Sequence, residues 1–181
     1  MPRERLPTVA FTLLELATVV VVVSIIAVLM IAAVAKLRQR AQRVQCTGNL
    51  RSLHVAAALA VQEEGMWPQV AISAADDASA QEYARAWIDA LRPHGGNEKT
   101  WICPTMQNEL GNPDYLDGAN VRVDYIGMSF DDKSTTPHNW PRHPWFLERG
   151  NMHGNGNLVI FTDGSVSDLK SIAAQAKEPQ R

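Results

Sequence analysis

Two cysteines are the residues whose chemistry is most narrowly defined by the sequence. Cys46 and Cys103 are the only cysteines of the chain, and they lie 57 positions apart. In an exported domain two such thiols are candidates for one disulfide, which would close a long loop and contribute about 4 kcal/mol in the chain-entropy model. Two buried thiols, or a metal pair that needs two further ligands, are the alternatives. Because no CxxC spacing is present, a zinc ribbon or a redox motif is not indicated. We predict a Cys46–Cys103 disulfide.

A histidine and an Asp-Gly pair form a second group near the C-terminus. His153 is followed by nine residues and then by Asp163 and Gly164. The Asp-Gly pair separates two apolar, β-branched runs, which predicts a hairpin with a two-residue type I′ turn and positive φ at both turn residues. This structural role explains the pair without chemistry. His153 precedes the first of these strands, and we predict that it too has a structural role, through a hydrogen bond across the sheet. A cation held by His153 with Asp163 or Asp168 is the alternative, and we predict no metal site.

Patterns typical of catalysis are missing from the sequence. It contains no GxSxG elbow, no HExxH, no P-loop and no dinucleotide-binding glycine pattern. His138 and His143 lie in a stretch rich in Pro and Trp, where Trp140 and Trp145 either form an aromatic platform for a ligand or cover a small core. The sequence therefore predicts a protein that is not an enzyme, with no catalytic residue and no cofactor.

An uncharged apolar run precedes all of these residues. Residues 16–35 carry no charge, and about 20 helical residues span the roughly 30 Å hydrocarbon core of a bilayer. A cleaved secretory signal has a shorter apolar core followed by a small-residue cleavage site. Ala32, Ala33 and Ala35 keep that alternative open. We predict a transmembrane helix.

The helix is expected to continue beyond the apolar run. Neither proline nor glycine interrupts residues 11–47. Five later apolar residues recur at helical spacing and form one stripe, which predicts a helix to Glu64 whose soluble half packs against a head: Cys46, Leu50, Leu53, Ala57 and Val61. Within the head we expect a helix over 78–91, a strand over 121–128, the C-terminal hairpin, and long loops over 104–120 and 131–151.

Charge is segregated along the chain. Five basic residues without an intervening acid follow the apolar run, whereas acidic residues outnumber basic ones after Ser52. This basic collar consists of Lys36, Arg38, Arg40, Arg43 and Arg51. Three interpretations of the collar stay open. It could contact anionic lipid headgroups, it could contact the acidic part of a neighbouring copy, or it could be a solvated helix face. Without interleaved aromatic residues it does not indicate nucleic-acid binding. Counted naively, these charges would place the head in the cytoplasm.

The N-terminal segment resembles a known processing site. Ala10-Phe11-Thr12-Leu13-Leu14-Glu15, followed by the apolar run, resembles the cleavage and methylation segment of the type IV pilin-like and type II secretion pseudopilin family. The resemblance implies that prepilin peptidase removes a leader of residues 1–10 and that Phe11 becomes a methylated N-terminus. Ala10 stands where the family has Gly. The same resemblance implies a head outside the cytoplasm, contrary to the charge count.

Glu15 is the fifth residue of the expected mature chain. A carboxylate at the edge of an apolar span costs several kcal/mol unless it is paired. The free amine of Phe11 in an adjacent copy would be a suitable partner, and the family resemblance assigns Glu15 this role in filament assembly. The alternative is a Glu15 side chain that reaches the headgroups.

Further motifs are similar to those of a planctomycete-type subfamily of pilin-like proteins. They are the Cys-x-x-Asn-Leu-Arg segment from Cys46, the Gly65-x-x-Pro68 helix exit, Cys103-Pro104, and His153 with Asp163-Gly164. The resemblance implies an α+β, pilin-like fold, in which a long N-terminal helix packs on a small antiparallel sheet. The expected segments are a leader (1–10), an assembly helix (11–35), a soluble helix half (36–64) and a globular head (65–181).

The expected function follows from this resemblance. It is a structural subunit of a type II secretion or type IV pilus-like filament. The chain would cross the cytoplasmic (inner) membrane once, with its head in the periplasm or at the cell surface. Its partners would be the membrane, homologous pilin-like subunits and prepilin peptidase, with no nucleic acid. The alternative is a monomeric, membrane-anchored module that binds an extracytoplasmic ligand.

Overall fold

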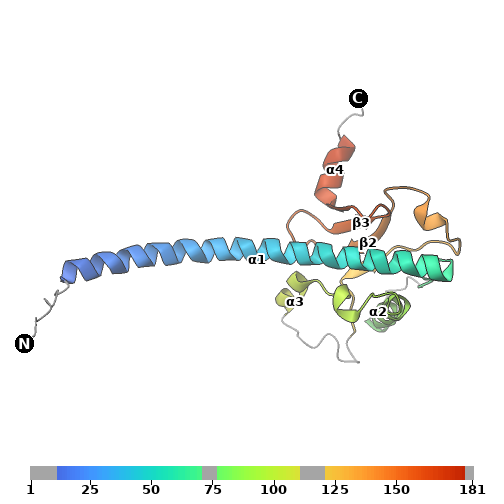
Figure 1. Cartoon of the computed structure of the whole chain (residues 1–181), viewed down its shortest axis with the longest axis horizontal. Coiled ribbons are helices and arrows are strands. Elements are labelled where there is room, and N and C mark those ends of the chain that lie inside the picture. The colour runs from blue at the N-terminus through green and yellow to red at the C-terminus, as the bar shows by residue number, and fades with distance from the viewer. Residues whose placement is uncertain (1–11, 71–76, 111–120, 178–181) are drawn as a thin grey trace, which may run out of the picture. The chain divides into compact units, whose positions relative to one another are not determined.

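The computed structural model describes residues 12–70, 77–110 and 121–177. The chain divides into two units, Met1–Arg38 and Gln39–Arg181. Its described part is α+β and combines a long, apolar N-terminal helix with a small antiparallel sheet and short helices (Figure 1). The expected fold class is confirmed at this level.

Helix α1 runs from Leu13 to Glu64 without a break, through Gly48. It begins after Thr12, whose hydroxyl accepts the N–H of Glu15 at 3.2 Å and caps the first turn. It ends at Gly65, which takes the positive φ (75°) common just past a helix end and donates its N–H to Val61 O. The prediction of one continuous helix to Glu64 is confirmed.

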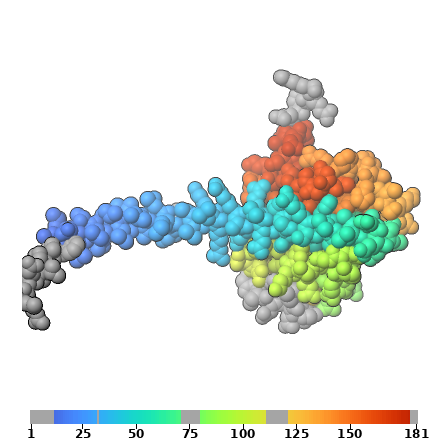
Figure 2. All heavy atoms as spheres, viewed as in Figure 1, coloured from blue at the N-terminus to red at the C-terminus, as the bar shows by residue number. Residues whose placement is uncertain are grey.

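The N-terminal unit consists, as far as it is described, of the first half of α1. Every large hydrophobic side chain from Leu13 to Leu37 is 50% or more exposed, as the blue part of Figure 2 illustrates. An 18-residue window of this helix has a mean hydropathy of 3.0 and none of it is buried. By length and composition, α1 is thus able to cross a membrane, and burial in a protein core does not account for its apolar character.

The sheet is a four-stranded antiparallel meander in the order β1-β2-β3-β4. Its strands are β1 (Tyr125–Gly127), β2 (Pro144–Glu148), β3 (Leu158–Phe161) and β4 (Val166–Asp168). Strand β1 is shorter than the predicted 121–128 strand. The loop predicted over 131–151 is wrong, because β2 is a central strand there. Its proline occupies the first strand position, where a missing N–H is tolerated, and turn-forming residues on both sides concealed the five-residue run.

The described part of the head contains three further helices and two short 3₁₀ turns. Helix α2 (Asp77–Leu91) confirms the predicted 78–91 helix. Helix α3 (Pro104–Leu110) replaces part of a predicted loop, and its proline at the first helical position is compatible with helix. Helix α4 (Leu169–Lys177) and two 3₁₀ turns, Glu98–Trp101 and Thr136–His138, complete the described elements.

The core of the head forms between α1, α2 and the sheet. All five residues of the predicted apolar stripe are buried, from Cys46 to Val61. In the view of Figure 1 the strands lie above α1 and helices α2 and α3 lie below it, and α2 also packs directly on the sheet, because Trp87 contacts Phe146 of β2. Five aromatic side chains in mutual contact fill the centre: Trp67, Trp87, Trp101, Trp145 and Phe146. Trp145 therefore belongs to the core, while Trp140 is 58% exposed.

The turn between β3 and β4 differs from the predicted type I′ turn. Asp163 has a negative φ, whereas Gly164 has a φ of 74°. Gly164 N–H donates to Phe161 O at 2.9 Å, and Phe161 N–H donates to Ser165 O at 3.0 Å. The loop is thus a three-residue type I turn closed by glycine in the left-handed region, a common hairpin alternative. The hairpin is confirmed and its turn type was wrong.

Gly127 provides a test of core packing. A Cβ at this position would overlap the indole of Trp87. We expect Gly127→Ala to lower the free energy of unfolding by about 1–3 kcal/mol, because an extra methyl group in a packed core forces side chains off their rotamers. The matched control is Gly48→Ala, where a Cβ meets nothing within 4 Å inside α1, and which should raise stability by about 0.5–1 kcal/mol. Urea unfolding followed by circular dichroism measures both, and equal effects would contradict this packing.

Candidate functional site

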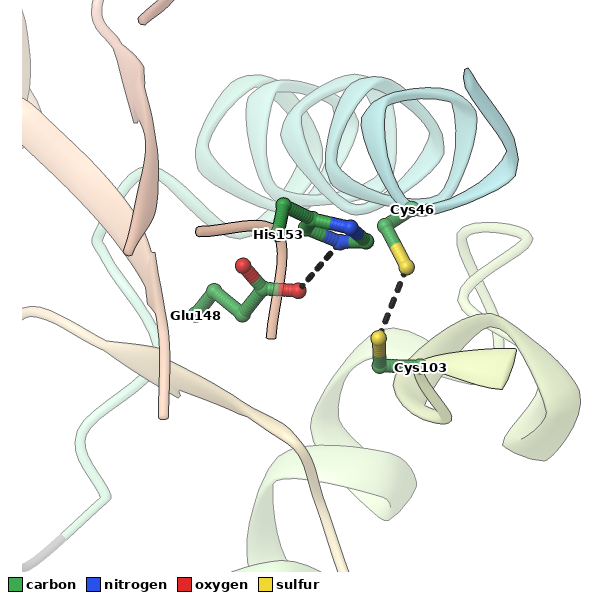
Figure 3. Close-up of side chains that lie close together, drawn as sticks. All are labelled: Cys46, Cys103, Glu148 and His153. Atoms are coloured by element: carbon green, nitrogen blue, oxygen red, sulfur yellow. Dashed lines mark hydrogen bonds and ion pairs between the residues drawn. The ribbon is translucent and has the colours of Figure 1, made fainter. Parts of the chain in front are cut away.

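Four side chains of metal-ligand type converge in the head from four separate segments. Cys46 comes from α1, Cys103 from the residue before α3, Glu148 from the end of β2, and His153 from the β2–β3 loop. Their ligand atoms all lie within 4.8 Å of one another. Figure 3 shows the four side chains pointing toward one another. We call these four residues the Cys-Glu-His cluster.

The cluster is buried and tightly spaced. The two Sγ atoms are 2.8 Å apart, and both cysteines are 0% exposed. His153 Nε2 lies 3.2 Å from Glu148 Oε1, and these two side chains are 4% and 1% exposed. A buried carboxylate is costly unless it is paired and hydrogen-bonded. Its placement among three other ligand-type groups therefore requires a physical reason.

Hydrogen bonds from neighbouring residues hold Cys103 in place. Asn49 Nδ2, one turn after Cys46 on α1, donates to Ile102 O at 2.8 Å. The Cys103 N–H donates to Asp124 Oδ2, also at 2.8 Å. Asp124 is fully buried and pairs with Arg122 at 2.8 Å. The backbone that carries Cys103 is thus connected both to α1 and to the residue that precedes β1.

Glu148 is oriented by β1 and β3. It faces Tyr125 across the β1–β2 ladder. Its Oε2 accepts the N–H of Leu158 at 3.2 Å, and its backbone carbonyl accepts Asn157 Nδ2 at 2.8 Å. These bonds leave Oε1 directed at His153. Outer hydrogen bonds of this kind commonly orient the ligands of metal sites.

The ionisation of the cluster is strongly coupled. The hydrogen bond from Cys46 lowers the pKa of Cys103 to about 6, with burial opposing it and His153 assisting. The same sulfur–sulfur bond, followed by burial, raises the pKa of Cys46. Hydrogen bonds to Cys103 and then to Glu148 raise the pKa of His153 to about 9. These shifts favour the thiolate at Cys103, the thiol at Cys46 and the protonated ring at His153.

The structure brings together some of the predicted site residues and separates others. It places the two cysteines in contact as free thiols, so the disulfide bond itself stays a prediction. His153 joins them, but Asp163 and Asp168 do not. Asp163 accepts the Ser165 N–H in the hairpin turn, and with Gly164 it has the structural role expected of it. Glu148 was missed, because a lone glutamate after an apolar run carries no local signal of burial.

The predicted processing and assembly residues lie at the other end of the chain. Ala10 and Phe11 fall outside the described residues. Glu15 occupies the first turn of α1, where a negative charge interacts favourably with the helix dipole. Among the described residues no side chain pairs with its carboxylate, which leaves it available to another molecule.

Asp168 connects α1 to the C-terminal hairpin. Its Oδ2 pairs with Arg43 at 2.7 Å, and its Oδ1 caps α4 by accepting the N–H and the hydroxyl of Ser171. Burial of Asp168 opposes its ionisation. The bonds from Ser171 and Arg43 together outweigh burial and hold the pKa of the carboxyl below its ordinary value of 3.8.

Two substitutions separate these roles. Asp168→Asn retains a capping oxygen and should cost less than about 1 kcal/mol, because Arg43 is partly exposed. Asp168→Ala should cost about 1 kcal/mol more through the lost cap. Since the folded pKa is depressed, the charge contribution is present above pH about 4 and is lost as pH falls through the folded pKa. Urea midpoints of the two variants across pH 3–7 measure this, and an unchanged difference between Asp168→Asn and the parent at acidic pH would contradict it.

Comparisons of the chain with protein-family models, with curated proteins and with solved structures found no match. The family resemblance therefore stays a prediction from sequence motifs.

Proposed function

We propose that the chain is a non-enzymatic structural subunit of a pilin-like or pseudopilin-like filament, anchored in the cytoplasmic membrane through α1. The observation that carries this proposal is the first half of α1, whose large apolar side chains are all at least half exposed. An apolar helix surface of this length requires lipid or other apolar helices around it. A filament subunit needs both environments, the membrane before assembly and neighbouring helices afterwards.

Glu15 supports assembly over simple anchoring. It carries a negative charge within the first turn of an otherwise apolar segment. A charge at the edge of a membrane span is costly without a partner. Ionisable residues in such a span usually mark a functional contact. A pairing with the amine of processed Phe11 in a neighbouring subunit would neutralise both groups. In a monomeric anchor the same carboxylate would have to reach the headgroups.

The basic collar supports a membrane boundary just after the apolar run. Lys36, Arg38 and Arg40 are exposed on α1, and each basic residue near an anionic surface contributes about 1 kcal/mol to membrane attraction. Arg43 differs, because it is engaged with Asp168 in the head. The transition from lipid to head would therefore lie between Lys36 and Arg43.

Mass spectrometry of protein recovered from its native membrane tests the processing step. We expect an N-terminal peptide that begins at methylated Phe11. A chain that still begins at Met1 or Pro2 would remove the support for filament assembly and favour the monomeric anchored binding module. A chain that begins after Ala33 or Ala35 would indicate a secreted protein and contradict the proposal.

A substitution that removes the charge but keeps the size of the side chain tests the assembly step. Glu15→Gln retains shape and membrane insertion but removes the charge that pairs with an amine, and we expect loss of crosslinked multimers in native membranes. The matched control is Glu82→Gln on the exposed face of α2, which should leave crosslinking unchanged. Multimers that persist in Glu15→Gln at the parental level would argue against this role of the carboxylate.

A further inference from the structure

We propose that Cys46, Cys103, Glu148 and His153 form a structural zinc site in the head. The four donors are two sulfurs, one imidazole nitrogen and one carboxylate oxygen, all within 4.8 Å of one another. Zn²⁺ binds these ligand types in closed tetrahedral sites. The two thiolates disfavour Mg²⁺ and Ca²⁺, which prefer oxygen ligands. The inference concerns only the unit Gln39–Arg181 and does not depend on filament assembly.

The sulfur–sulfur distance alone does not decide between a disulfide and a metal. At 2.8 Å the two sulfurs are farther apart than the roughly 2.05 Å of a disulfide. They are closer than the roughly 3.8 Å that two zinc-bound sulfurs at about 2.3 Å from the metal would have. Each outcome requires a side-chain adjustment of about 1 Å. The decision rests on the other members of the cluster.

Glu148 and His153 favour the metal. A disulfide would use the two cysteines alone and would leave the Glu148–His153 pair beside it with no part in the link. A zinc ion uses both groups, since it replaces protons and neutralises most of the negative charge of two thiolates and one carboxylate. The sequence suggested a metal pair only if two further ligands were found, and the tertiary structure supplies both.

The surrounding hydrogen bonds match those of a formed site. Asp124 accepts the backbone N–H of Cys103, and Leu158 donates to the second oxygen of Glu148. Both ligands are therefore oriented before a metal binds, which lowers the cost of assembling the site. Because all four ligand side chains are buried, the site has no open position for water, and its role is structural. The ion would connect α1, the segment before α3, the end of β2 and the β2–β3 loop.

The full chain, isolated in detergent without reductant or chelator, tests the proposal. We expect about one zinc per chain by elemental analysis, and two free thiols after denaturation with chelator. X-ray absorption of the parent protein should show two sulfur and two nitrogen or oxygen neighbours. Neither measurement requires a variant to fold. A chain that is lighter by two hydrogen atoms and contains a Cys46–Cys103 disulfide would overturn the proposal, as would metal-free protein that does not take up added Zn²⁺.

Substitutions locate the site. Glu148→Gln and His153→Ala should each weaken zinc affinity by more than the roughly 10- to 100-fold typical of outer-shell changes, and Asp124→Asn should fall within that range. The matched control is Asp168→Asn, another buried carboxylate on the sheet but outside the cluster, which should retain full zinc content. Reconstitution with Co²⁺ should give thiolate-to-cobalt charge-transfer absorption in the parent and in Asp168→Asn. Zinc content that is equal in all of these variants would overturn the assignment.

Discussion

If α1 anchors the chain as proposed, two lysines in the apolar run, Val21→Lys with Ile25→Lys, will release the chain from the membrane. Both positions lie in the first half of α1 and are 58% and 56% exposed. A lysine at the centre of a membrane helix costs roughly 2.5–3.5 kcal/mol, so two at successive turns should offset most of the driving force for insertion. The measurement is the fraction of the chain that resists extraction by alkaline carbonate.

The matched control introduces two lysines with the same spacing elsewhere on α1. Val55 and Leu59 have the same spacing on α1 and are 57% and 38% exposed, but they belong to the head. Val55→Lys with Leu59→Lys should therefore leave membrane association unchanged. If the chain with lysines at 21 and 25 still resists extraction, the apolar run does not cross the bilayer, and the proposed anchoring would be wrong.

Trp67→Ala will destabilise the head more than any other single change considered, by about 3–5 kcal/mol. Trp67 is 0% exposed and follows Gly65 and Met66, the two residues after the end of α1. Its ring contacts Trp87 on α2, Trp145 on β2 and Phe130, with centroids 4.8–6.0 Å apart, and its Nε1 donates to Met128 O at 2.8 Å. Truncation would leave a large cavity and an acceptor without its donor, and both effects are costly.

Chemical unfolding followed by circular dichroism measures this loss. The control is Trp140→Ala, because Trp140 is 58% exposed and its removal should change stability by less than about 0.5 kcal/mol. Trp67→Phe should lose less than the alanine variant, since it retains part of the ring packing. A Trp67→Ala head as stable as the parent would contradict the described core.

The cluster and the aromatic core share one structural feature. Both join the second half of α1 to segments distant in sequence, the cluster through Cys46 and the aromatic core through the other members of the buried apolar stripe. In the proposed filament subunit, zinc at the cluster would hold this half of α1 to the head at a point close to the membrane boundary. The proposals remain separable, because zinc content is measured independently of processing and crosslinking.

Local patterns in the sequence were sufficient for α1, α2 and the hairpin, but not for the short helices α3 and α4. The apolar run, the stripe from Cys46 to Val61 and the lack of prolines predicted α1 to its last residue, because helical periodicity and helix breakers act over one or two turns. The β3–β4 hairpin was also predicted from a local pattern, because its turn residues and the two apolar runs that flank them are adjacent in the sequence. Its turn type was not, since Asp-Gly is compatible with more than one turn and the strand register decides between them.

Only the tertiary structure decided the composition of the site. The sequence singled out Cys46, Cys103 and His153 and predicted that the two cysteines meet, but it did not reveal that His153 joins them. Glu148 escaped notice because the Pro144–Glu148 segment lies among turn-forming residues, and its central place in the sheet depends on pairing with β1 and β3. Burial of a charged residue is set by which segments fold over it, and such long-range pairing is not encoded by any local pattern. The sequence by itself therefore determined the long helix and the residues capable of chemistry, whereas the fold determined which of them act together.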